Sequence, residues 1–457
     1  MKKNRITKLK IDKLFGYQDI SIDFESRVKI LIGENGLGKT TVLNMLYFLL
    51  DKKFDKLDDI KFERIELVFS NKRKISFTHN SLSYFLEKPK RYQSGQFYQI
   101  LSKQLSQKDV NNLKNIIDDK KIHPIERDKI IAAKINELGV KINAPSRYIY
   151  ENIKKLISEF EAIEFQKIIE QIDSEVQSKI LYFPTFRRIE SQFSNLSSNS
   201  REALLEEYPF LDESDLSKLY NADIIQFGMQ DVEARISNIT SEITQKSLVG
   251  FSNITGDLLG QLSQNFPISI VRKRKDDDKL KIILERVGSR ISFDDKENII
   301  NYVKSGDVTN KGLLYLIDKL IDLYDEQESL DKAIKDFRDT CNLYLNRKAF
   351  VYDESQVSLK ILRENSSESV ELDYLSSGEK QIVSLFSKIY LEKEENYIVL
   401  FDEPELSLSI FWQQRLLPDI MSSQQCNFLL AVTHSPFIYD NNLEEYAFGL
   451  DQYFVKN

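Results

Sequence analysis

The sequence is poor in the residues that staple small secreted domains or hold structural zinc. Its 457 residues include two cysteines, Cys341 and Cys426, without C-x-x-C spacing, and three histidines. These counts argue against a disulfide framework and against a zinc site. No uncharged apolar run reaches the roughly 18 residues of a membrane span, and no hydrophobic segment follows the basic N-terminus as in a signal peptide. We therefore expect a cytoplasmic protein without a membrane partner.

The sequence also lacks an excess of basic residues. It has 64 lysines and arginines against 71 aspartates and glutamates, which gives a formal charge of −7. Nucleic-acid binding would therefore need a local basic patch. Two short basic clusters are present, at residues 88–91 and 272–275, and acidic residues follow the second. A DNA contact and an ordinary solvated surface are both open at these clusters.

Glycine is scarce, with 15 residues, yet three of them stand at positions 33, 36 and 38. Residues 33–41 match the pattern G-x-x-x-x-G-K-S/T in full. The apolar run 28–32 predicts a buried strand before the motif, and residues 41–50 predict an apolar helix after it. Glycine allows the backbone N–H groups of such a loop to converge on a phosphate, and the helix N-terminus adds partial positive charge. The pattern predicts a phosphate-binding loop.

The residues of this loop have distinct expected roles. Lys39 is expected to reach the β- and γ-phosphates, and the Thr40 hydroxyl to hold the Mg²⁺ that bridges them. ATP and Mg²⁺ are the substrate and cofactor that follow. The residues predicted to bind the nucleotide within the loop are Asn35, Gly36, Gly38, Lys39, Thr40 and Thr41.

A second group of motifs lies near the C-terminus. The apolar strand predicted at 397–401 ends in Asp402 and Glu403, and two carboxylates at the end of a buried strand need a partner. We expect Asp402 to contact Mg²⁺ and Glu403 to activate the water that attacks the γ-phosphorus. A further strand, predicted at 428–433, delivers His434 to contact the γ-phosphate or that water.

Between these motifs, residues 374–381 open a predicted helix. Ser377 and Gly378 stand at its start, where free backbone N–H groups would engage an anion. A phosphate loop, this helix start, an acidic strand end and a strand-end histidine follow one another in the order that an ATP-binding cassette ATPase requires.

With these motifs the sequence resembles the ABC-type ATPases of the SMC, RecF and OLD group, over about residues 1–80 and 350–440. Residues 375–381 are similar to the signature motif, with Ser377 and Glu379 where transporters usually carry Gly and Gln. Residues 401–408 resemble the Walker B strand and D-loop of the OLD group. Ser409 stands where that group often has a histidine, so the role of that histidine does not carry over.

The resemblance implies an α/β fold, with an ABC-type P-loop head whose mixed sheet is flanked by helices. Residues 1–80 and 350–457 would form the two parts of this head. Residues 81–349 predict a large, mainly helical insertion, and a strand near 179–184 would belong to the ATPase core. Arg187 and Arg188 after that strand either face a nucleotide or lie in a solvated turn.

One segment of the insertion has a long apolar repeat. Within residues 312–344 apolar side chains recur at steps of three and four, which predicts a helix of roughly 50 Å. A long packing helix and a short coiled-coil hairpin both fit this spacing.

The resemblance further implies a composite site in a head-to-tail homodimer or higher oligomer. Ser377 of one protomer would contact the γ-phosphate held by Lys39 of the other, so a monomer should hydrolyse ATP poorly. OLD proteins also carry a C-terminal Toprim nuclease domain, whereas 23 residues follow His434 here. Nuclease activity would then come from another chain.

This layout resembles the stand-alone ATPase subunits of bacterial anti-phage systems, first PARIS and then the Septu and retron-associated ATPases. The predicted function is an ATPase that acts as sensor and scaffold. It would control an effector such as a Toprim or HNH nuclease and respond to a phage protein or DNA.

Two other functions compete with this one. A RecF- or SMC-like ATPase that repairs or clamps DNA is the main alternative. A transporter nucleotide-binding subunit fits least, because about 270 residues separate the two halves of the motif set.

Overall fold

The computed structural model describes residues 5–86, 101, 104–118, 122–139, 144–184, 229–262, 277–287, 291–305, 309–366, 368–392 and 396–455. The paired arginines at 187 and 188 and both basic clusters lie outside these residues. Within the described part, no helix combines the length and the apolar character needed to cross a membrane.

Contacts divide the chain into two units, each built from separate stretches of sequence. The first unit comprises Met1–Tyr182, Asn396–Pro404 and Cys426–Asn457, and the second comprises Phe183–Glu395 and Glu405–Gln425. The predicted domain boundaries at residues 80 and 350 stay a prediction. The two units defined by contacts instead meet at residues 182, 395, 404 and 425. The strand that ends in Asp402 thus joins the unit that holds the phosphate loop.

A five-stranded sheet forms the centre of the first unit. Its strands are β3 (Val28–Ile32), β6 (Lys179–Phe183), β10 (Tyr397–Asp402), β11 (Cys426–Thr433) and β12 (Ala447–Gly449). They follow the order β12-β3-β11-β10-β6, and the pairs β12–β3, β3–β11 and β11–β10 are parallel. Every residue of β10 is buried, which fits a sequence that is apolar up to its last residue, Asp402.

A second sheet in this unit is antiparallel. It contains β1 (Ile6–Leu14), β2 (Gln18–Asp23), β4 (Arg64–Phe69) and β5 (Lys74–Thr78) in the order β2-β1-β4-β5. In β4, buried residues alternate with more exposed ones, the pattern of a sheet with one face on a core.

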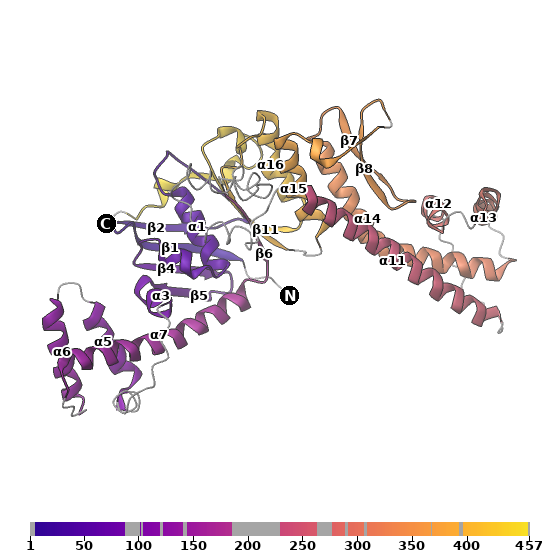
Figure 1. Ribbon diagram of the computed structural model, residues 1–457. Coiled ribbons are helices and arrows are strands. Elements are labelled where there is room, and N and C mark those ends of the chain that lie inside the picture. Colours follow the sequence, from indigo (N-terminus) through magenta and orange to yellow (C-terminus); the bar gives the residue numbers. More distant parts are fainter. Residues whose placement is uncertain are drawn as a thin grey trace, which may run out of the picture. The chain divides into compact units, whose positions relative to one another are not determined.

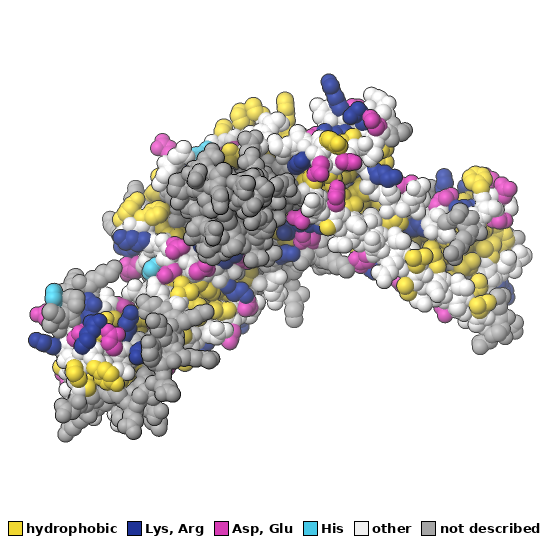
Figure 2. All heavy atoms as spheres, in the orientation of Figure 1, with side chains coloured by type: hydrophobic (Ala, Val, Ile, Leu, Met, Phe, Trp, Pro, Cys, Tyr) yellow, Lys and Arg dark blue, Asp and Glu magenta, His cyan; other side chains and the backbone are white. Residues whose placement is uncertain are grey.

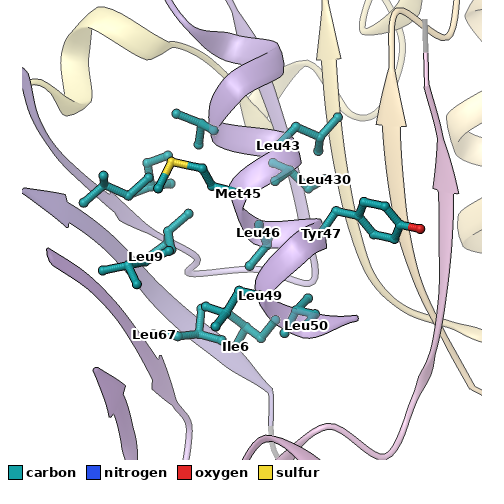
Figure 3. Packing of buried hydrophobic residues seen from close by; sticks show 14 of the residues in the cluster. Ile6, Leu9, Leu43, Met45, Leu46, Tyr47, Leu49, Leu50, Leu67 and Leu430 are labelled. Atoms are coloured by element: carbon teal, nitrogen blue, oxygen red, sulfur yellow. The ribbon is translucent and has the colours of Figure 1, made fainter. Parts of the chain in front are cut away.

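Helix α1 (Lys39–Leu50) packs its apolar residues against both sheets. Figure 3 shows Ile6, Leu9 and Leu67 of the antiparallel sheet on one side of the helix and Leu430 of β11 on the other. Leu46 is fully buried in this core. Burial of one such leucine contributes about 1.5–3 kcal/mol, so this helix ties the two sheets together.

Helices also extend the first unit. They are α2 (Phe54–Asp58), α3 (His79–Leu86), α5 (Gln107–Asp118), α6 (Pro124–Glu137) and α7 (Ser146–Glu175). Side chains of α7 such as Leu156 share a small core with α3, α5 and α6, while its Phe165 and Ile172 reach the main core. One helix therefore connects the helical part to the sheets (Figure 1).

The second unit consists mainly of helices. They are α11 (Met229–Leu262), α12 (Asp277–Arg286), α13 (Phe293–Ser305), α14 (Lys311–Asn342), α15 (Ser377–Leu391) and α16 (Ile410–Ser422). A small antiparallel sheet contains β7 (Lys348–Asp353), β8 (Ser358–Arg363) and β9 (Ser369–Val370).

Helices α11 and α14, together called the arm, lie side by side (Figure 1). They are antiparallel, because Ser247 contacts Gln327 and Gly250 lies opposite Leu323. The buried side chains of α14 at 320, 324, 327, 331, 334, 337 and 341 recur at steps of three and four. The segment predicted at 312–344 is thus one long helix, about 48 Å by its 32 residues, with coiled-coil spacing toward its neighbour.

Candidate functional site

Strand register brings three motifs to one edge of the parallel sheet. Asp402 at the end of β10 pairs with Val432 of β11, and Thr433 at the end of β11 pairs with Ile32 of β3. The segments that follow β3, β10 and β11 therefore leave the sheet together. We call this place the loop edge. Ligands of open α/β sheets usually bind at such carboxyl ends.

The phosphate loop after β3 needs its glycines. Gly33, Gly36 and Gly38 have φ of 148°, 87° and 88°, where other residues are strained. A Cβ on Gly33 would also lie 2.8 Å from the Leu37 side chain. Helix α1 begins at Lys39, two residues before the predicted start, so the loop leads directly to a helix N-terminus.

Lys39 is folded into the loop. Its Nζ donates to the carbonyl oxygens of Gly33 at 2.8 Å and Glu34 at 3.0 Å, and it lies 3.1 Å from Nε2 of His434. The residue is 4% exposed. The buried ammonium group is held by two carbonyl oxygens, and an anionic phosphate could bind it as a further hydrogen-bond acceptor.

Thr40 and Asp402, 362 positions apart, meet at the loop edge. The Thr40 hydroxyl donates to Oδ1 of Asp402 at 3.0 Å, and Asp402 is 1% exposed. A hydroxyl and a carboxylate at this distance are the oxygen ligands that Mg²⁺ takes beside nucleotide phosphates. The pair fits the predicted metal ligands.

Glu403 lies next to His434. Its Oε1 is 3.0 Å from His434 Nε2, and the two side chains are 15% and 35% exposed. The backbone of Glu403 has φ of 51° and its N–H donates to the Val432 carbonyl. A non-glycine residue in this conformation is strained, which is common at functional sites. The carboxylate is thus held at the strand end and remains reachable from solvent.

His434 Nε2 faces both Lys39 and Glu403. In a neutral imidazole, one ring nitrogen either donates or accepts a hydrogen bond. Nε2 therefore cannot accept from Lys39 and donate to Glu403 at the same time. If Lys39 donated its hydrogen bond to a bound phosphate instead, His434 Nε2 could donate to Glu403.

The exposed part of the loop edge contains other predicted residues. Asn35, Gly36 and Thr40 are exposed, and Thr41 is half-buried in the first turn of α1. The structure thus brings together all predicted loop residues with Asp402, Glu403 and His434.

Ser377 and Gly378 lie in the second unit, at the start of α15. Ser376 caps this helix, since its hydroxyl oxygen accepts from the Glu379 backbone N–H at 3.5 Å and its own backbone N–H donates to Oε2 of Glu379 at 2.8 Å. Lys348 pairs with the same carboxylate at 3.1 Å. The buried Glu379 therefore orders the helix start, a role that sequence reasoning missed although S-x-x-E is a capping-box pattern.

Gly378 is also constrained by packing. A Cβ at this position would lie 3.0 Å from the Ser407 carbonyl oxygen and 3.0 Å from the Trp412 ring. No larger residue fits without a shift of the segment before α16. The glycine thus lets the signature helix and the segment after the acidic strand end approach closely.

Phe15 is a second residue that sequence reasoning missed. Its ring lies 3.2 Å from the position that a Cβ on Gly38 would take, and 41% of the residue is exposed. An aromatic ring against the phosphate loop offers a stacking surface for a base. Two aromatic residues around Gly16 in the turn between β1 and β2 are the signal that could have found it.

These elements define an ABC-type P-loop ATPase head with a large helical insertion, and the predicted fold class is confirmed. Residues 5–439 match the family model described as an AAA ATPase domain. The chain belongs to this family. None of the curated proteins matches the sequence.

Several solved structures are similar at low identity. One is an SMC head bound to the C-winged helix domain of ScpA, with 10% identity, 95% and 90% of the two chains covered and a TM-score of 0.32. Another is an SMC head with an extended coiled coil bound to the C-terminal domain of ScpA derived from Pyrococcus furiosus, with 12% identity, 95% and 91% coverage and a TM-score of 0.32. A third is the recombination mediator RecF, with 9% identity, 95% and 94% coverage and a TM-score of 0.28.

Proposed function

We propose that the loop edge binds and hydrolyses ATP. The observation that carries this proposal is the hydrogen bond between Thr40 and Asp402, which joins the phosphate loop to the acidic strand end. Phosphate binding would use the loop N–H groups and Lys39, and Phe15 would stack on the base. Thr40 and Asp402 would hold Mg²⁺, which when bound neutralises charge on the phosphate oxygens.

Glu403 is the proposed general base. It would take a proton from water as the water oxygen attacks the γ-phosphorus, while the bond to the β–γ bridging oxygen breaks and ADP leaves with that electron pair. The partial exposure of Glu403 gives water access to the carboxylate. A hydrogen bond from His434 Nε2 would orient it.

Two protomers would share this chemistry. Ser377 is exposed at the start of α15, and exposed apolar residues occur just before it and in the segment 406–411. Tyr374 and Phe411 are 75% and 78% exposed, and Leu406 and Ile410 are also exposed. Hydrophobic side chains gather over α16 in Figure 2. Such a patch supports a homodimer in which Ser377 acts on the partner's nucleotide.

We further propose that this ATPase serves anti-phage defence as the sensor and scaffold of a separate effector nuclease. The arm supports this role, because it offers a long surface that ATP binding does not use. DNA clamping is less favoured, since α11 and α14 together contain 12 acidic and seven basic residues.

Glu403→Gln tests the enzymatic proposal. This isosteric variant should bind ATP normally and hydrolyse it at least 100-fold more slowly, because an amide accepts no proton. Glu34→Gln is the matched control, since it removes an exposed carboxylate from the same loop and should keep wild-type turnover. Wild-type hydrolysis by Glu403→Gln would refute the role of Glu403.

The same two variants test the cellular role. In cells that carry the gene with its neighbours, plaque counts should rise for Glu403→Gln and stay low for Glu34→Gln. Altered survival after DNA damage with unchanged plaque counts would favour the repair alternative instead.

A further inference from the structure

One side of the arm is covered by α12, and α11 and α14 form a groove elsewhere on its surface. On the covered side, Leu280 and Leu284 of α12 pack against Leu320 of α14 and other apolar residues. The groove, of about 950 Å³, lies along α11 and takes α14 residues on its other wall. We call it the arm groove. Its residues include Asn238, Ser241, Gln245, Val249, Asn253 and Leu323.

The spacing of these residues suits a third helix. Along α11 they recur at steps of three and four, the same repeat that the buried seam of the arm uses. From 238 to 253 the groove extends about 22 Å along the helix axis, which is about four helical turns. A helix of similar length could therefore place one row of side chains along it.

The composition of the groove favours a mixed contact face. Asn238, Ser241, Gln245 and Asn253 offer amide and hydroxyl groups, and Val249 and Leu323 add apolar side chains. A purely hydrophobic helix would leave these groups without partners when they are buried. An occupant with small or amide side chains would satisfy them.

The floor of the groove is held rigidly. Gln327, which lines it and is 1% exposed, accepts hydrogen bonds from the Ser247 hydroxyl at 3.0 Å and from Arg286 Nη1 at 3.1 Å. Arg286 also pairs with the buried Asp331 at 2.6 Å. The Ser247 hydrogen bond ties α11 to α14 and the Arg286 contacts tie α12 to α14, so the groove exists before anything binds.

The net charge of the arm favours a positively charged binding partner. The 12 acidic and seven basic residues of the two arm helices leave a formal charge of −5. Glu242, Glu326 and Lys246 lie along the groove itself, where Lys246 pairs with Glu242 at 3.1 Å, and these three side chains leave a formal charge of −1. This field attracts a basic protein segment and repels the phosphates of a nucleic acid.

We propose that the arm groove binds a basic α-helical segment of another protein, with small or amide side chains along its contact face. This inference deepens the proposed scaffold function, on which it rests only for the partner's role as an effector. The binding itself requires neither ATP nor the loop edge.

The experiment compares two serine variants of α11 in the full-length chain. Ser241→Arg places a bulky cation in the groove, and Ser237→Arg places the same side chain at an exposed position that does not line it. The probe is a fluorescein-labelled helical peptide of about 20 residues made of Ala, Gln and Lys, longer than the groove. A second peptide has Glu in place of Lys, and short duplex DNA is the third probe.

Fluorescence anisotropy should show that the Lys peptide binds wild type and Ser237→Arg equally. Ser241→Arg should weaken this binding at least tenfold, and the Glu peptide should bind at least tenfold less tightly than the Lys peptide. Circular dichroism and ATP turnover of both variants should match wild type, which separates this test from that of the loop edge.

Four binding results would overturn the proposal, and so would one change in oligomeric state. They are no binding of the Lys peptide, equal losses in both variants, equal binding of the Glu peptide, and DNA binding that Ser241→Arg abolishes. A changed sedimentation coefficient in Ser241→Arg alone would also overturn it, because the groove would then be an interface between copies of the chain.

Discussion

The loop edge and the arm are built by different means. At the loop edge, backbone hydrogen bonds between parallel strands set the positions of Thr433, Asp402 and Ile32. Residues far apart in sequence, such as Thr40 and Asp402, therefore lie within hydrogen-bond distance of each other. In the arm, side chains set the register, through an apolar seam with a few buried polar contacts such as Ser247 to Gln327. The first design suits chemistry, which needs fixed atoms, and the second leaves a surface free to recognise a partner.

The largest expected effect weakens the contact between α12 and the arm helix α14. Asp331→Ala leaves the buried Arg286 without its 2.6 Å partner and Tyr352 without an acceptor, which should lower the free energy of unfolding by about 3–5 kcal/mol. Urea unfolding measures this loss. The double variant Arg286→Met with Asp331→Leu should recover most of it, because no buried charge remains.

A loss below about 1 kcal/mol in Asp331→Ala would show that the polar contacts do not hold α12 against the arm, since unpaired buried charges cost more than that. ATP binding by the variant sharpens the comparison. It should be unchanged, because none of these residues belongs to the first unit.

The next effect concerns the loop edge alone. Lys39→Ala removes the ammonium that the loop carbonyls hold, and ATP affinity should fall about 100-fold, since a hydrogen bond to a charged group contributes up to about 3 kcal/mol. Isothermal titration calorimetry measures this change. Lys52→Ala, just beyond α1 and paired with Asp173, is the control and should bind ATP normally. Unchanged ATP affinity in a folded Lys39→Ala protein would show that residues 33–41 do not bind the ATP phosphates.

Much of the first unit was predictable because its signals are local. The apolar run at 28–32 coincides with β3, and the glycine spacing marked the loop that the positive φ values then explain. Asp402 and Glu403 were recognisable because two carboxylates after a buried strand need partners.

The rest depends on contacts between distant residues, which no local pattern records. The aromatic pair around Gly16 marks Phe15 in the sequence, but its contact with Gly38, 23 positions away, appears only in the fold. The repeat in α14 left two interpretations open, because the same spacing serves a single packing helix and a paired one. Only its contact with α11 decides between them. The ordering role of Glu379 depends in part on its ion pair with Lys348, 31 positions away, and on its burial, neither of which the local S-x-x-E pattern records.

The smallest expected effect uses the two cysteines, one in each region. Burial raises the pKa of the Cys426 thiol in β11 to about 12 and that of Cys341 in α14 well above its usual range. In the unfolded chain a thiol ionises near pH 9.0. The contribution of the buried, protonated Cys426 thiol to the free energy of unfolding is therefore full below pH 9, and it is lost as the pH rises toward about 12.

Urea unfolding at pH 8, 9 and 10 tests this dependence. Between pH 9 and 10, Cys426→Ala should lose about 1 kcal/mol less stability than wild type, because it lacks one titrating thiol. Cys341→Ala should show a similar difference for the second unit. Parallel pH curves for wild type and both variants would contradict the burial of the thiols.

The most direct test of the account is a mixture of two inactive variants, Lys39→Ala and Ser377→Arg. The account holds that one protomer supplies the phosphate loop and the other the signature motif to each ATP. A mixed dimer then regains one intact site, so the mixture should recover about a quarter of wild-type turnover when subunits exchange freely. No recovery, although both variants fold and exchange subunits, or full activity of a wild-type monomer, would contradict the shared site.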